Sequence, residues 1–232
     1  MKGMITQWLY SCKWFLLGGL GLSVALAVAT PVLYNSFMNS GDPQGVMMAM
    51  MMPILAILFS VAIPMESLSS NFANMILCRF QAFTVTTMKP IKFCFSHLAV
   101  WGVAAVCSAV CTILPIISMS VFIDGYTDTM LLDNVKLGVS YIAFCLGFDY
   151  IIGALTIKLK SRDKASILAL VVGMGIGIAA IIIAAANNID VDLMEVVTAI
   201  GNNWYIVAGG MAALVAVGMA LMLNFIRKGE LS

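Results

Sequence analysis

The chain alternates between long uninterrupted apolar stretches and short polar connections. A transmembrane helix needs about 20 predominantly apolar residues, because each residue adds about 1.5 Å across a hydrocarbon core of about 30 Å. None of the apolar stretches alternates apolar and polar residues as the strands of a membrane barrel do. The pattern therefore predicts an all-α membrane protein with six transmembrane helices: Trp14–Tyr34, Val46–Met65, Phe93–Ile123, Leu131–Ile157, Lys164–Ala186 and Trp204–Ile226.

The composition agrees with this fold class. Apolar residues make up 62% of the 232 residues and charged residues only 10%, against roughly a quarter in a soluble domain. Lys and Arg form no basic patch outside short loops, so we expect no nucleic-acid partner. The longest polar segment, residues 66–92, is shorter than the roughly 50 residues of the smallest domains. Residues 1–232 are therefore predicted to form a single transmembrane domain surrounded by membrane lipid.

The positive charges predict the orientation of the chain. If the N-terminus is cytoplasmic, all of the twelve Lys and Arg residues except Lys136 fall on the cytoplasmic side, where such residues are enriched. With six spans, both termini are then cytoplasmic. Ala27-Val28-Ala29 has the small residues of a signal-peptide cleavage site, but the apolar run before it is long for a signal peptide. We therefore expect the first span to be retained.

The segment Glu66–Lys92 carries an amphipathic pattern on the predicted cytoplasmic side. Ser69 or Ser70 could cap a helix, and Pro90 disfavours a helical conformation at the residue before it. Apolar residues recur at spacings of four, four and three on one helix face: Phe72, Ile76, Phe80 and Phe83. This predicts a short amphipathic helix along the membrane surface, followed by a break before the third span. The helix is either an interfacial anchor or a docking element for a soluble subunit.

Other segments allow both a functional and a structural interpretation. Asp149 is the one carboxylate well inside a span, where a central charge costs about 2.5–3.5 kcal/mol; it is either an ion or proton relay or a structural hydrogen-bonding group. The external amphipathic segment, residues 187–203, is either a re-entrant helix or an ordinary loop helix. Glycines within residues 173–177 favour close helix–helix packing. The flexible thioethers of the second span could form a pliable wall facing the cargo: Met48, Met51 and Met52.

The chain lacks the motifs of a catalytic or nucleotide-binding protein. No segment reads G-x-x-x-x-G-K-[ST], the phosphate-binding loop of many ATPases. The single histidine, His97, is interpreted as an interfacial or packing residue, and no cysteine falls in a predicted external loop. We therefore expect no catalytic residue, no metal and no cofactor on this chain.

The whole pattern resembles the membrane subunit of ABC-2-type ATP-binding-cassette exporters in its short bacterial form. The basic stretch Met1–Trp14 is similar to the family's interfacial elbow helix, assigned here to residues 1–13. The loop after the second span contains Glu66, Arg79-Phe80-Gln81-Ala82-Phe83 and Lys89-Pro90-Ile91-Lys92-Phe93, although Lys89-Pro90 stands where the family usually has Leu-Pro. The basic loop Lys158–Lys164 also fits. Within the family, the chain looks most similar to permeases that export phenol-soluble modulins, which are amphipathic peptides.

The resemblance implies a dimer of permeases bound to two cytoplasmic ATPases in the bacterial plasma membrane. ATP and Mg²⁺ would bind to the ATPase, and the second permease would be a copy of this chain or a related one. Exported cargo would be a hydrophobic or amphipathic peptide. A coupling helix seated in the ATPase would include Phe72, Ile76, Arg79, Phe80 and Phe83. The alternative from the residues themselves is a secondary transporter or ion channel that uses Asp149.

Overall fold

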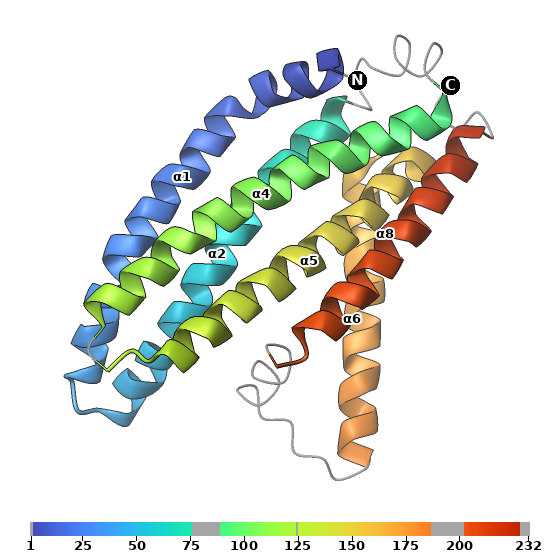
Figure 1. Ribbon diagram of the computed structural model, residues 1–232. Coiled ribbons are helices and arrows are strands. Elements are labelled where there is room, and N and C mark those ends of the chain that lie inside the picture. Colours follow the sequence, from blue (N-terminus) through green and yellow to red (C-terminus); the bar gives the residue numbers. More distant parts are fainter. Residues whose placement is uncertain (1, 76–88, 124, 187–201, 228–232) are drawn as a thin grey trace.

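A computed structural model describes residues 2–75, 89–123, 125–186 and 202–227. Within these ranges the regular structure is entirely helical. Consecutive described helices run in opposite directions along the bundle (Figure 1). The elements are α1 (Lys2–Met38), α2 (Pro43–Met75), α4 (Pro90–Phe122), α5 (Asp128–Leu159), α6 (Arg162–Ala186) and α8 (Trp204–Arg227).

Five of the described helices are long and apolar enough to cross a membrane. These segments are Leu16–Met38, Pro43–Ala62, Pro90–Phe122, Asp128–Leu159 and Trp204–Arg227. Such helices suit hydrocarbon because each backbone polar group bonds within its own helix. The expected all-α class and the multi-pass membrane character are confirmed. α6 coincides with the predicted fifth span but is not among these five, so the count of six spans stays a prediction.

The helix ends follow from local chemistry. α4 begins with Pro90 at a first-turn position, and Lys89 before it is extended with φ −60° and ψ 136°, as expected for a residue preceding proline. The break predicted before this span is confirmed. At the start of α5 the Thr127 hydroxyl accepts a hydrogen bond from the Met130 amide at 3.3 Å. α5 ends at Lys160, whose φ of 51° is left-handed.

α2 differs from the expectation. It runs without interruption through Met75, so the predicted separation of the second span from a new helix capped by Ser69 or Ser70 is wrong. The segment after Met65 contains neither Gly nor Pro until after Met75. Serine and asparagine disfavour a helix interior only modestly, and the helix therefore continues.

The helices pack in two groups with different neighbours. α5 packs most extensively against α8, whereas α1 packs against α2 and α4. One apolar core joins α2, α4, α5 and α8 and includes Met65, Val100, Ala154 and Met222. A second core, around Ile57, joins α2, α4 and α5.

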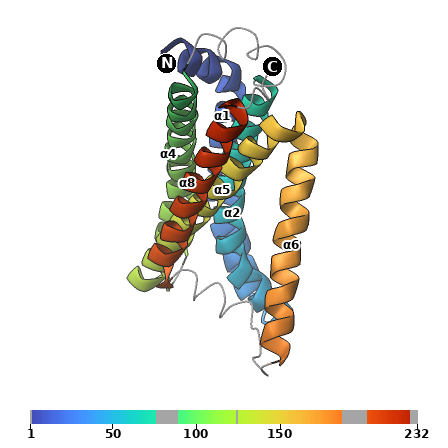
Figure 2. The ribbon, with the colours of Figure 1, turned by 90° about the vertical axis from the view of Figure 1, so that its right-hand side faces the viewer.

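α6 stands apart from the rest of the bundle (Figure 2). Near its start, Ala165 and Ala169 pack against Ile152 of α5. Further along, Gly175 has no neighbouring atom within 4 Å of an added Cβ, and Ile178 is 55% exposed. Close packing is thus absent at Gly175 within the described part of the chain, whereas a Cβ at Gly173 would lie 4.0 Å from Phe148 Cε2 of α5.

Candidate functional site

A buried polar pair on α4 forms the centre of the candidate site. His97 and Trp101 are 0% and 2% exposed, and their spacing of four places both on one helix face. The Trp101 Nε1–H donates a hydrogen bond to His97 Nε2 at 2.8 Å. Because an indole nitrogen only donates, His97 Nε2 is an acceptor and the imidazole is neutral. The interpretation of His97 as a packing residue agrees with this environment.

Tyr150 connects this pair to α5. Its ring meets the His97 ring edge-on, with centroids 4.5 Å apart and an interplanar angle of 69°, an arrangement that aromatic rings favour. Its hydroxyl donates to the Cys94 carbonyl of α4 at 3.1 Å. The phenol is thus held by a ring contact and a hydrogen bond to the same helix.

Glycines allow the three helices to approach closely. A Cβ at Gly153 of α5 would lie 3.3 Å from His97 Cε1. A Cβ at Gly218 of α8 would lie 3.0 Å from Tyr150 Cδ1 and 3.3 Å from the Tyr150 carbonyl oxygen. We call His97, Trp101, Tyr150, Gly153 and Gly218 the α4–α5–α8 joint. Its tight packing favours movement of these helices as one body.

Asp149 lies beside the joint, next to Tyr150 on α5. It is 7% exposed, and it precedes the end of α5 at Leu159 by about 15 Å of helical rise. The carboxylate predicted inside the fourth span is therefore enclosed by protein rather than turned toward lipid. Among the described residues, no group of three His, Cys, Asp or Glu side chains could hold a metal.

The predicted coupling residues lie mostly outside the described residues. This holds for Ile76, Arg79, Phe80 and Phe83, while Phe72 falls in the last turn of α2. In the external amphipathic segment, residues 187–201 also lie outside the described ranges.

The methionines of the predicted cargo wall differ in their exposure. Met48 is 47% exposed, whereas Met51 and Met52 are half-buried. The three residues therefore do not present one uniformly exposed surface. A part of this wall is nevertheless accessible on the flank of α2.

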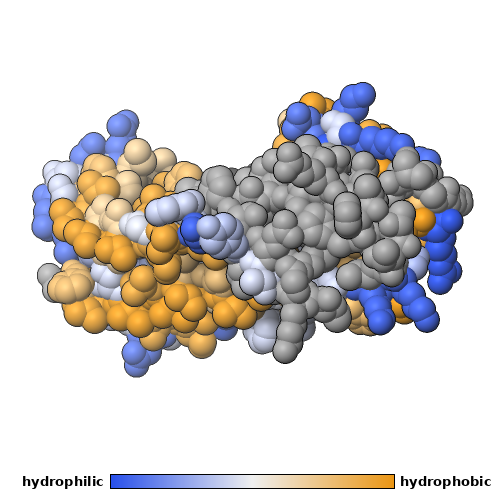
Figure 3. All heavy atoms as spheres, turned by 90° about the horizontal axis from the view of Figure 1, so that it is seen from above, coloured by the Kyte–Doolittle hydropathy of each residue, from blue (hydrophilic) through white to orange (hydrophobic). Residues whose placement is uncertain are grey.

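Charged groups lie at opposite ends of the apolar bundle. Hydrophilic side chains gather at the two ends, with hydrophobic side chains along the flank between them (Figure 3). α1 begins and α8 ends at the same end of the bundle (Figure 1). The helix order brings these basic residues to that end: Lys13, Lys89, Lys92, Lys158, Lys160, Arg162, Lys164 and Arg227.

The opposite end is acidic. It carries Asp42, Asp128 and Asp133, and Lys136 forms a salt bridge with Asp133 at 3.3 Å. Between α4 and α5, the Tyr126 hydroxyl accepts a hydrogen bond from Asn134 Nδ2. Burial raises the pKa of Tyr126 above its usual value. Among the described residues, the two ends of the bundle therefore carry opposite net charge.

No protein-family model, no curated protein and no solved structure matches this chain. The fold defines it as a helical multi-pass membrane protein. Sequence reasoning did not identify the bond between Trp101 and His97, although their spacing of four was a usable signal. The role of Gly218 depends on where α8 crosses α5, which no local pattern indicates.

Proposed function

We propose that this chain is the membrane-spanning permease subunit of an ATP-driven exporter. Its cargo is a hydrophobic or amphipathic peptide, and a separate cytoplasmic ATPase of the ATP-binding-cassette class supplies the energy. The observation that carries the proposal is the continuation of α2 beyond its apolar part at the basic end of the bundle. The residue pattern described above for ABC-2-type exporters supports the same assignment.

The continuation of α2 beyond Met65 offers a binding surface for a soluble partner. From Glu66 to Met75 the helix contains one charge and five serine or asparagine residues, so it suits water or a headgroup region rather than hydrocarbon. At about 1.5 Å per residue it extends roughly 15 Å beyond Met65. Because Met65 lies in the apolar core, a displacement of this extension would be transmitted directly to the transmembrane helices. The predicted docking residues from Phe72 to Phe83 begin on this extension.

The charge distribution supports a cytoplasmic position for that end. Lys and Arg favour the cytoplasmic side of a membrane, and the basic residues meet at the end where α2 terminates. We propose that both termini and the ATPase-docking segment face the cytoplasm. We further propose that the chain lies in the plasma membrane of a bacterium.

α6 supports a second permease subunit. Val171 and Ile178 are 59% and 55% exposed and lie, with Gly175, on one helix face. Small residues on exposed faces of membrane helices allow a neighbouring helix to come close. We propose that this face, the α6 face, contacts the second permease, whether a copy of this chain or a related one.

Recruitment of the ATPase tests the proposal. The full chain is purified from its native membrane under mild conditions and its associated ATPase activity is measured. Phe80→Asp places a charge on the predicted docking face, whereas Gln81→Asp places the same charge beside that face. We expect the ATPase to co-purify with the wild type and with Gln81→Asp but not with Phe80→Asp. A wild-type chain that recruits no cassette ATPase contradicts the proposal.

A secondary transporter remains the second candidate because the structure encloses Asp149 within protein. An enclosed intramembrane acid is a candidate ion or proton site. This alternative predicts transport that needs no ATP and is lost in Asp149→Asn. Export that depends on ATP and survives Asp149→Asn contradicts it.

A further inference from the structure

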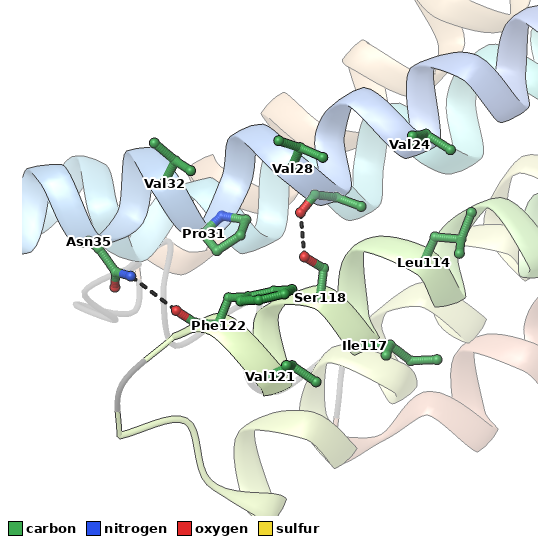
Figure 4. A pocket seen from close by; sticks show the side chains of 11 residues that line it. Val24, Val28, Pro31, Val32, Asn35, Leu114, Ile117, Ser118, Val121 and Phe122 are labelled. Atoms are coloured by element: carbon green, nitrogen blue, oxygen red, sulfur yellow. Dashed lines mark hydrogen bonds between the residues drawn. The ribbon is translucent and has the colours of Figure 1, made fainter.

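A laterally open groove of about 630 Å³ lies between α1 and α4 (Figure 4). Its walls are aliphatic and largely exposed side chains: Val24, Val28 and Val32 of α1, and Leu114, Ile117 and Val121 of α4. Both helices belong to the segments that can cross a membrane. The groove therefore opens toward hydrocarbon rather than toward water.

The polar side chains that line the groove form hydrogen bonds within the protein. The Ser118 hydroxyl donates to the Ala27 carbonyl, and Asn35 Nδ2 donates to the Phe122 carbonyl at 3.0 Å. These two bonds join α1 to α4 along the groove (Figure 4). A group that enters the groove contacts mainly methyl and methylene groups. A hydrocarbon occupant therefore fits best, because a polar occupant would leave its hydrogen-bonding groups unpaired.

The length of the groove matches one leaflet. From Val24 to Asn35 the α1 axis rises about 16 Å, and half of a hydrocarbon core is about 15 Å. The groove ends near the acidic end of the bundle, where Asn35 and Phe122 approach the connections that follow α1 and α4. It thus runs from the middle of the membrane toward the headgroups at that end.

The chemistry of the groove favours an apolar occupant. The Ser118 hydroxyl and the Asn35 amide already bond across the groove to Ala27 and Phe122, so an occupant finds mainly apolar side chains to contact. A single alkyl chain is flexible, apolar and thin enough to follow the groove. We propose that this groove binds an acyl chain of a bilayer phospholipid in the leaflet at the acidic end of the bundle. This inference does not depend on the proposed transport function.

Photolabelling of the full chain in phospholipid nanodiscs tests the proposal. The probe is a phosphatidylcholine that carries a diazirine in the middle of one acyl chain, and labelled residues are mapped by mass spectrometry. We expect labelling of Leu114, Ile117 and Val121 to exceed, by several-fold, labelling of similarly exposed residues that do not line the groove, such as Val139 and Val106. If groove and control residues are labelled simply in proportion to their exposure, the proposal is overturned.

Filling the groove supplies a matched comparison. Ala27→Phe adds a ring inside the groove, whereas Ala29→Phe adds the same ring on an exposed part of α1 that does not line it. Groove labelling should fall several-fold in the first variant and stay unchanged in the second. If Ala27→Phe does not fold, Ile117→Trp fills the groove from its exposed side, and labelling of Leu114 and Val121 should fall. Unchanged labelling in a folded filling variant overturns the proposal.

Discussion

Trp101 donates its indole N–H to His97 Nε2 across 2.8 Å within a fully enclosed part of α4. The bond fixes which imidazole nitrogen is unprotonated and thereby orients the ring toward Tyr150, 4.5 Å away between centroids. One side-chain pair within a helix thus sets the surface that α4 presents to α5.

Removing this hydrogen bond is expected to weaken the protein. Trp101→Phe keeps an aromatic ring but leaves His97 Nε2 without its indole donor, which costs about 1–3 kcal/mol for a buried group. Thermal unfolding in detergent, followed by near-ultraviolet circular dichroism, measures the loss. Trp204→Phe is the control, because Trp204 is 40% exposed. Equal stability of the two variants contradicts the role given to the pair.

The crossing of α5 and α8 is expected to depend on Gly218. Leucine at this position forces atoms against Tyr150, because even a Cβ lies 3.0 Å from its ring. Overpacking of this kind costs about 1–3 kcal/mol. Gly210→Leu on the same helix has open space and should be tolerated. Denaturant titration of the two variants measures the difference, and a stable Gly218→Leu variant rules out a tight crossing.

The orientation is expected to place the acidic end outside the cell. In intact cells a membrane-impermeant maleimide should label Asp133→Cys, whose side chain is 60% exposed. Lys164→Cys should react only after the cells are opened. The parent chain provides the background from its native cysteines. Labelling of Lys164→Cys in intact cells reverses the proposed topology.

The α6 face is expected to contact the second permease subunit. A photoreactive p-benzoylphenylalanine at Ile178 should form an adduct with another permease chain, because this side chain points away from its own bundle. The same group at Val106, which is 64% exposed on α4, is the control. An adduct at Val106 but not at Ile178 moves the subunit contact to another face.

The positions of the apolar segments were predictable because each is apolar over the thickness of a membrane, although α1 begins at Lys2, within the segment expected to form the elbow helix. The start of α4 was equally predictable, because Pro90 restricts the backbone of Lys89 through a local steric effect. The end of α2 was not, because serine and asparagine between Met65 and Met75 neither break nor strongly favour a helix. The fold class therefore follows from composition, whereas this boundary depends on the surrounding structure.

The candidate site was less predictable than the spans. Asp149 was identified because an acid inside an apolar run is conspicuous, but its enclosure depends on neighbouring helices. The groove joins residues 87 to 91 positions apart through the Asn35–Phe122 and Ser118–Ala27 bonds. Its existence depends on how α1 and α4 diverge, and hydrophobic periodicity contains no such information.

ATP-dependent transport tests the central proposal most directly. Inside-out membrane vesicles containing this chain and its co-purified ATPase are supplied with a fluorescent amphipathic peptide, and uptake is measured with ATP, with a non-hydrolysable ATP analogue and with a protonophore. The account predicts uptake with ATP, none with the analogue, and little change from the protonophore or from Asp149→Asn. Uptake without ATP that is abolished by the protonophore and by Asp149→Asn would contradict it.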